Sequence, residues 1–186
     1  MGGERRLRRV VGGERRVSGR PAGLVVRPAR TSDVRSIRRL VDLYVDDRRL
    51  LSKATVTLYE DVPDFTVATV GDAVVGCGAL HVLWEDLGEV RTVAVDPAMR
   101  GRGVGHALLE RLVARARELG VERVFCLTFE TAFFRRHGFV EIEGAPVAHD
   151  VYEQLLQSYD EGVAEFLDLE RVKPNTLGNH RMLLQL

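Results

Sequence analysis

The stretch RGRGVGHALLERLV, which begins at Arg100, places three glycines and two arginines at the start of a helix-like run. Glycine lets the backbone approach a ligand closely, and a helix N-terminus offers unpaired N–H groups and the positive end of a dipole. Together these features predict an anion site of the kind that binds phosphate.

Two common phosphate-binding loops do not fit this stretch. A P-loop needs Gly-Lys-Ser/Thr after its glycines, whereas the chain reads Gly105-His106-Ala107. The dinucleotide fingerprint GxGxxG, counted from Gly103, has Leu108 where its third glycine would be. No βαβ unit with a following acidic residue accompanies it either. The phosphate must therefore belong to another class of ligand.

The elements that position this loop follow from hydrophobic periodicity and turn residues. Apolar residues at helical spacing follow Thr31, which is the expected cap of a first helix, and a second, shorter helix or irregular segment runs to about Tyr59. Gly71-Asp72 turns a hairpin, and Gly120 ends a central helix. Strands are expected at 24–27, 65–70, 73–84, 89–95, 123–129, 139–143 and 181–186, and further helices at 104–119, 131–137 and 151–168. The order predicts an α/β (α+β) fold with a mixed central sheet flanked by helices.

Length and charge narrow the class of protein. The chain of 186 residues suits one ordinary domain, and its net charge of zero favours neither nucleic acid nor a membrane as partner. Residues 1–20 hold seven arginines and two glutamates, and a repeated GGERR without an apolar face predicts a disordered tail over residues 1–23. The domain would then cover residues 24–186.

Cysteine and histidine usage excludes two further kinds of site. Cys77 and Cys126 lie in separate apolar runs without a CxxC pair, which favours a reduced cytoplasmic compartment. The five histidines show no metal-ligand spacing, so no metal site is predicted.

A third loop pattern does fit: Arg/Gln-x-x-Gly-x-Gly/Ala at the start of a helix, at Arg100, Gly103 and Gly105. It resembles the pyrophosphate loop of the GNAT acetyltransferases. VRPARTSDVRSIRRLV is similar to the family's first strand and helix, and FFRRHGF to its late aromatic-xxx-Gly-Phe motif. CGALHVLWEDLGEVRTVAVDPAMRG, VFCLTFETAFFRRHGF and VKPNTLGNHRMLLQL resemble the short amino-acid N-acetyltransferases that make N-acetylglutamate in arginine biosynthesis.

The resemblance implies a single GNAT domain with acetyl-CoA as co-substrate. The loop amides would bind the pyrophosphate, and the pantetheine arm would pair with Val93 and Val95 like an added strand. A backbone N–H within residues 92–95 would hold the oxyanion. The residues expected to bind acetyl-CoA are Val93, Ala94, Val95, Arg100, Gly101, Arg102, Gly103, Val104, Gly105 and His106.

Acetyl transfer to an amine needs a base, and Glu89 is the candidate because it opens the strand that leads into the loop. Resemblance to the family puts a glutamate of this strand in the same role; the alternative is a solvated residue at a strand end. Many GNAT members carry a tyrosine as acid where this chain has Phe134. Thr131 is the nearest hydroxyl, although it could instead be the N-cap of the following helix.

A glutamate-like substrate also needs cations for its carboxylates. Arg91 lies two residues from Glu89 and shares its face of the strand, so it could hold a carboxylate or remain a surface arginine. Asn179 and Arg181 match the family's tail segment, with His180 replacing the usual serine. They could line the substrate pocket or fix the final strand.

The leading hypothesis is an acetyl-CoA:L-glutamate or L-glutamine N-acetyltransferase. The nearest alternative is a GNAT enzyme for another amine: a protein N-terminus, a lysine or a small molecule. An acetyl-CoA sensor without catalysis belongs to a different class, and a nucleic-acid-binding protein with a basic tail to a third. A homodimer is the default expectation for the assembly.

Overall fold

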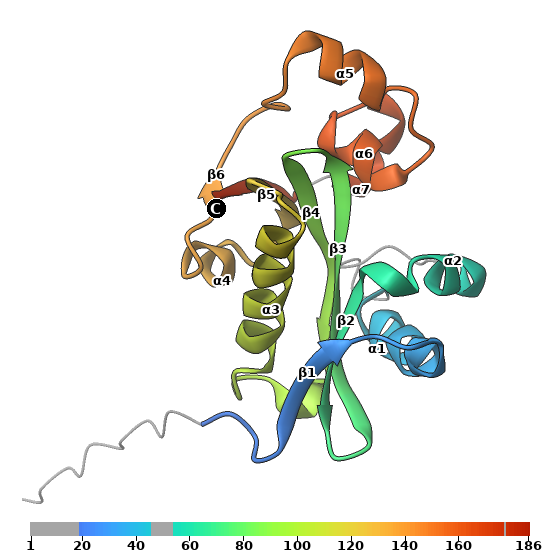
Figure 1. Ribbon diagram of the computed structural model, residues 1–186, viewed down its shortest axis with the longest axis vertical. Helices are drawn as coiled ribbons and strands as arrows, with labels where there is room; N and C mark the ends of the chain where they lie inside the picture. Colours follow the sequence, from blue (N-terminus) through green and yellow to red (C-terminus); the bar gives the residue numbers. More distant parts are fainter. Residues whose placement is uncertain (1–18, 46–53, 177) are drawn as a thin grey trace, which may run out of the picture.

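The computed structural model describes residues 19–45, 54–176 and 178–186, and the described residues form a seven-stranded sheet of order β1-β2-β3-β4-β5-β7-β6 (Figure 1). Within this sheet only β4 and β5 are parallel, and every other neighbouring pair is antiparallel. The strands are β1 (Leu24–Pro28), β2 (Phe65–Val70), β3 (Ala73–Trp84), β4 (Leu87–Val95), β5 (Arg123–Thr128), β6 (Val140–Glu141) and β7 (His180–Gln185). The mixed sheet confirms the predicted fold class.

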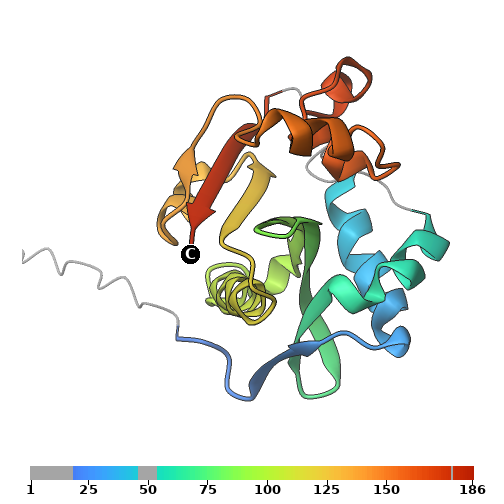
Figure 2. The ribbon, with the colours of Figure 1, turned by 45° about the horizontal axis from the view of Figure 1, so that its top comes forward.

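Helices cover both faces and one end of the sheet. Figures 1 and 2 show α3 on one face, α1 and α2 on the other, and the α5–α7 segment at the end of β3 and β4. The helices are α1 (Val34–Val45), α2 (Thr55–Glu60), α3 (Val104–Glu118), α4 (Thr131–Arg135), α5 (His149–Leu155), α6 (Glu161–Phe166) and α7 (Lys173–Thr176). Single 3₁₀ turns are η1 (Thr31–Asp33), η2 (Val62–Asp64), η3 (Pro97–Met99) and η4 (Glu170–Val172).

Strand alternation sorts the core into two layers. Leu80 and Val90 pack with Leu112 on the side that we call the α3 face. Cys77 and Ala79 pack with residues of α1 on the opposite side, the α1 face. Because side chains alternate along a strand, His81 shares the α1 face with Ala79. The sheet therefore separates two environments, and residues of β3 and β4 reach both.

Strand β4 is irregular at Thr92, whose φ of 58° is rare for a residue with a side chain. Arg91 pairs with Ala79 and Ala94 with Cys77, so two residues of β4 lie opposite the single Gly78 of β3. This is a β-bulge, which bends a strand and disrupts its ladder. On its other side β4 pairs with β5 only over Leu87–Glu89, and the two strands run unpaired beyond that point.

Local sequence signals account for much of this framework. The hairpin of β2 and β3 is confirmed, with Val70 paired to Ala73 across the Gly71-Asp72 turn. Gly120 follows the end of α3 with a φ of 82°, as predicted for a residue at this position. The predicted tail is outside the described residues over 1–18, as are residues 46–53 of the connection to α2. At the tail's last residues Pro21 is buried and its carbonyl accepts from the N–H of Leu24.

Two local predictions were wrong. Thr31 does not cap the first helix; it begins η1, and the Asp33 carboxylate accepts from the Arg30 N–H and from Arg27. The expected helix over 151–168 is two helices, α5 and α6, separated by residues 156–160. The break occurs because the Asp160 side chain caps α6, accepting from the Val163 N–H at 3.0 Å.

Candidate active site

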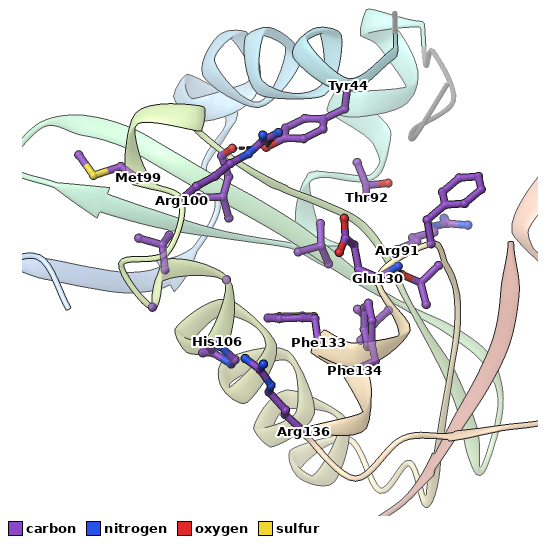
Figure 3. Close-up of a pocket in the computed structure, with 18 of the residues that line it drawn as sticks. Tyr44, Arg91, Thr92, Met99, Arg100, His106, Glu130, Phe133, Phe134 and Arg136 are labelled. Carbon is purple, nitrogen blue, oxygen red and sulfur yellow. Dashed lines mark hydrogen bonds between the residues drawn. The ribbon is translucent and has the colours of Figure 1, made fainter. Parts of the chain in front are cut away.

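A cavity of about 520 Å³ lies where β4 and β5 separate, between the β4 bulge, the start of α3 and α4. Nine residues of the predicted site line it: Arg91, Val93, Val95, Arg100, Gly101, Gly103, Val104, Gly105 and His106. Thr92 lines it as well, whereas the predicted Ala94 does not, because its side chain is buried in the core of the α1 face. Figure 3 shows Arg100 with Tyr44 on one side of this cavity and His106 with Arg136 on the other. The strand, the glycine loop and the helix start therefore meet at one opening.

The loop has the geometry that an anion cradle needs. Gly101 and Gly103 have φ of 72° and 75°, and Gly103 is the N-cap residue of α3. These angles suit glycine and disfavour any residue with a Cβ. A Cβ on Gly105 would lie 3.5 Å from the Phe133 ring, which also lines the cavity. The loop and the first-turn amides of α3 thus fit a pyrophosphate group.

Tyr44 ties the loop to the end of β4. Its hydroxyl donates to the Val95 carbonyl at 2.5 Å and accepts from Arg100 Nη2 at 3.3 Å. The Arg100 guanidinium lies over the Tyr44 ring, 5.4 Å from its centre. Arg102 instead turns to Met99 Sδ at 3.4 Å and is not on the cavity lining. Of the loop arginines, Arg100 is therefore the one that faces the cavity.

Aromatic rings form the opposite wall. Phe133 and Phe134 of α4 line the cavity in an edge-to-face pair, with ring centres 5.2 Å apart. His106 packs on Phe133, and its Nδ1 lies 2.7 Å from Nε2 of His137. Such a short distance requires one ring to donate and the other to accept, and burial lowers the pKa of His137. An apolar wall of this kind fits the pantetheine arm.

Glu89 is buried, with an exposed fraction of 2%, and it projects from the α1 face of β4. Burial raises its pKa to about 7, against the opposing effect of the Arg91 guanidinium. Among the described residues, its Oε2 makes no hydrogen bond. This burial excludes the alternative left open by the sequence, in which Glu89 is a solvated residue at the end of a strand. A carboxylate that titrates near neutral pH can take a proton from an ammonium group.

Arg91 stands beside Glu89, with Nη1 3.7 Å from Glu89 Oε2. The same Nη1 lies 2.8 Å and 3.0 Å from the two carboxylate oxygens of Asp160, and Nη2 lies 4.0 Å from Asp61. Its Nε is buried without a hydrogen-bond partner among the described residues. Arg91 is therefore not a surface arginine, and its unused donor can receive a carboxylate oxygen.

Gly162 of α6 packs closely against the side chains of Glu89 and Arg91. A Cβ on Gly162 would lie 2.4 Å from Glu89 Oε2 and 2.7 Å from Arg91 Nη1. Only the missing side chain lets α6 approach the two charged groups so closely. Helix α6 is thus part of the wall around Glu89.

Thr128 brings a buried hydroxyl to the cavity, which Tyr44 and Thr92 also line. It is buried at the end of β5, lines the cavity and accepts from the Glu130 N–H at 2.9 Å. Thr131 is the first residue of α4, and its side chain is not among the described ones that line the cavity. The N-cap of α4 is Glu130, so the alternative reading of Thr131 as the cap was wrong.

The tail residues lie apart from the cavity lining. Arg181 donates to the carbonyls of Gly144 and Glu165 and also to that of Phe166, and it stacks over the Phe125 ring. These contacts hold the last strand to the end of α6. Asn179 lies in the turn before β7 and its N–H donates to the Thr176 carbonyl. Their predicted contact with substrate stays a prediction.

Three residues that complete the site were not predicted from the sequence. Asp160 pairs with Arg91, Tyr44 anchors the loop and Thr128 supplies a buried hydroxyl to the cavity. Thr128 could have been found from the sequence, because it lies at the end of the strand that follows the central helix. The pairing of Asp160 with Arg91 had none, because 69 positions separate the two residues in the chain.

The described residues were also compared with what a thiol nucleophile, a metal site and a membrane-spanning helix require. Burial raises the pKa of Cys77 to about 12 and that of Cys126 well above its usual value, so neither thiol suits a nucleophile. The described part of the chain contains no group of three or more His, Cys, Asp or Glu placed to hold a metal ion. None of its helices is long and apolar enough to span a membrane.

Comparison with known proteins points the same way. The model of the "Acetyltransferase (GNAT) family" matches residues 36–139. An amino-acid acetyltransferase of Mycobacterium tuberculosis is 64% identical over 165 residues, which are 87% of this chain and 94% of that protein. An amino-acid acetyltransferase of Pseudomonas putida is 33% identical over 128 residues, and the match spans 30% of its length.

Solved structures show the same fold. A Mycobacterium tuberculosis protein in complex with CoA and NLQ superposes with a TM-score of 0.84 at 64% identity, covering 87% of this chain and 99% of that chain. N-acetylglutamate synthase from Neisseria gonorrhoeae, complexed with coenzyme A and N-acetyl-glutamate, gives a TM-score of 0.71. Its identity is 22%, and the match covers 90% of this chain and 36% of that chain, so it shows the fold alone.

Proposed function

This chain belongs to the acetyltransferase (GNAT) family, and we propose that it transfers the acetyl group of acetyl-CoA to the α-amine of L-glutamate or L-glutamine. The observation that carries the proposal is the pairing of a buried carboxylate, Glu89, with the largely buried guanidinium of Arg91 on the strand that leads into the glycine loop. We further propose that this reaction is the first step of arginine biosynthesis. In this proposal the enzyme acts in the cytoplasm as a homodimer.

Acetyl-CoA is the co-substrate, and the cavity supports a placement for each of its parts. The pyrophosphate lies on the amides of residues 101–106, with Arg100 beside it. The pantetheine arm enters where β4 and β5 separate and pairs with the free edge of β4 at Val93 and Val95. This placement brings the thioester next to the bulge at Thr92.

Arg91 and Glu89 act on the amino acid. An α-carboxylate bound at the buried Nε of Arg91 holds its own α-ammonium within reach of Glu89, because the two groups are separated by a single carbon. Glu89 then removes a proton from the ammonium group and exposes the lone pair of the nitrogen. Its burial supports this role, since a carboxyl whose pKa is about 7 can exchange protons at neutral pH.

Attack of the amine on the thioester carbonyl forms an oxyanion and then expels the CoA thiolate. A backbone N–H within residues 92–95 holds the oxyanion, and the bulge supports this by turning β4 backbone groups away from the β3 ladder. The thiolate needs a proton as it leaves. That proton is the second one that the amine nitrogen loses as the amide forms. Thr128 lies in the cavity and is better placed than Thr131 to pass it on, giving its hydroxyl proton to the sulfur and receiving the proton of the nitrogen.

The test is an assay of free thiol with acetyl-CoA and a panel of amino acids and other amines. Turnover confined to glutamate and glutamine supports the proposal. Turnover with lysine, peptide N-termini or small amines alone would identify another acetyltransferase. Tight acetyl-CoA binding without turnover on any amine would identify a sensor instead.

A further inference from the structure

His81 lies directly opposite Glu89 in the ladder between β3 and β4. Opposed residues on antiparallel strands project to the same face with their Cβ atoms about 5 Å apart. The two side chains therefore leave the sheet together on the α1 face. The co-substrate loop starts α3, which covers the opposite face. The proposed acetyl transfer assigns no role to His81.

One hydrogen bond leads from His81 toward solvent, to Asp64. Its Nδ1 lies 2.7 Å from Asp64 Oδ2 in η2, and its Nε2 lies 3.8 Å from Asp160 Oδ2. Exposure rises along the same line: the side chain of Glu89 is 3% exposed, whereas those of His81 and Asp64 are 27% and 30% exposed. The cluster thus connects the most buried carboxylate of the site to solvent.

Acetylation of an ammonium group releases a proton. The reactants are R–NH₃⁺ and the acetyl thioester, and the products are the neutral amide and the neutral thiol, so one proton leaves the site in each turnover. Glu89 receives that proton in the proposed mechanism. It is sealed by Gly162 on one side, and bound acetyl-CoA would fill the opening between β4 and β5. A second route to solvent is required.

We propose that His81 and Asp64 are the proton outlet of Glu89. This inference rests on the proposed function, because it needs Glu89 to be the base. Asp64 is a carboxylate and can only accept, so Nδ1 of His81 carries the hydrogen and Nε2 of the neutral ring has a lone pair. The Glu89 carboxyl gives its proton to Nε2, directly or through one water. The ring then releases the Nδ1 proton to solvent at Asp64, and Glu89 is a carboxylate again. Exchange with water moves the remaining hydrogen from Nε2 back to Nδ1, so that Nε2 can accept in the next turnover.

The charges around His81 suit a transient imidazolium. Asp64 faces it from η2, Asp160 from the start of α6, and Glu89 from β4. Arg91 is one cation nearby, with its Nη1 paired to Asp160, and Arg181 is another, close enough to interact with the charge of Glu89. Further acidic side chains in this region are Asp61 near Arg91 and Glu165 near Glu89. The carboxylates around the ring therefore outnumber the cations.

The test replaces His81 by glutamine, which can still donate to Asp64 but cannot carry a proton through. At neutral pH and low buffer concentration, kcat of His81→Gln should fall about 10-fold or more, while the Kd for acetyl-CoA stays unchanged. Added imidazole, a mobile proton carrier, should restore much of the loss. The matched control is His180→Gln, because His180 also pairs with a carboxylate, Glu141, but on the β6–β7 edge. It should keep the wild-type rate with or without imidazole.

Asp64→Asn is the second variant, and it should show a smaller loss of kcat with the same dependence on imidazole. If His81→Gln does not fold, this variant decides: a buffer-dependent rate supports the outlet and a buffer-independent rate overturns it. A wild-type rate in His81→Gln, or a loss that imidazole does not repair, would show that His81 only holds η2 to β3. Absence of wild-type turnover on every amino acid would overturn the proposed function as well, so the two failures are distinct.

Discussion

Replacing Glu89 by glutamine tests the central step of the mechanism. Glutamine keeps the size of the side chain and removes its basicity, so the fold and acetyl-CoA affinity should survive. Turnover at neutral pH should fall by about 10²–10⁴, the usual contribution of a positioned general base. Part of this loss should return as the pH is raised, because free amine then becomes available without help.

The pKa of about 7 sets the expected pH profile of the wild type. About half of the Glu89 carboxyls are ionised at pH 7 and about a tenth at pH 6, so kcat/KM should fall about tenfold per pH unit on the acid side. Glu89→Gln should lose this limb near pH 7. Its rate should instead follow the deprotonation of the amine, which has a pKa of roughly 8 to 10.

The assay is release of free CoA thiol between about pH 5.5 and 9.5, with acetyl-CoA affinity measured separately. Glu122→Gln is the matched control, since Glu122 is an exposed glutamate in the turn before β5. It should keep both the rate and the profile of the wild type. A near-normal rate of Glu89→Gln at neutral pH would show that the base lies elsewhere, and an unchanged acid limb would show that another group sets it.

Four further changes probe the fold around the site. The stability of the wild type should fall as pH rises from about 4.5 to 7, because burial disfavours the ionised form of Glu89. The rise of the Glu89 pKa from 4.5 to about 7 corresponds to about 3 kcal/mol of folding free energy at most. Over this pH range the melting temperature of Glu89→Gln should therefore rise relative to that of the wild type. Gly162→Ala would place a Cβ 2.4 Å from Glu89 Oε2 and should lower both melting temperature and turnover; unchanged turnover would mean that α6 is not part of the site. Gly103→Val should weaken acetyl-CoA binding far more than amino-acid binding in calorimetry, and equal weakening would indicate unfolding. Deleting residues 1–18 should leave turnover unchanged. Deleting residues 1–22 should raise the KM for acetyl-CoA, because it also removes Arg20, which packs against the glycine loop: its Cγ would lie 3.2 Å from a Cβ placed on Gly103.

Much of the framework could be predicted from local signals. Alternating apolar residues mark β2 and β3, the Gly71-Asp72 pair marks their turn, and Gly120 marks the end of α3. Each of these signals acts over a few residues, so the sequence displays it directly. The pattern of the glycine loop at Arg100 belongs to the same group, and the structure gives it the positive φ angles that its glycines allow.

Contacts between distant segments could not be predicted in this way. Asp160 starts α6 by capping it, after α5 has ended at Leu155, and it also reaches Arg91 on β4. Strand β7 enters the sheet between β5 and β6, a placement that no pattern within RMLLQL reports. The burial of Glu89 depends on Gly162, which packs over it from another element. In each instance the deciding partner lies far away along the chain.

The bulge at Thr92 shows how a regular pattern can mislead at a functional strand. Strict alternation in EVRTVAV would place Val93 on the same face as Glu89 and Arg91. In the structure Val90 and Val93 both pack with the core of the α3 face, and Ala94 packs with that of the α1 face. The alternation has therefore reversed at Thr92, whose φ of 58° absorbs the extra residue. This reversal lets one strand turn its charged pair to the α1 face, where the amine is proposed to bind, and its valines to the α3 face, where the acetyl donor is proposed to bind.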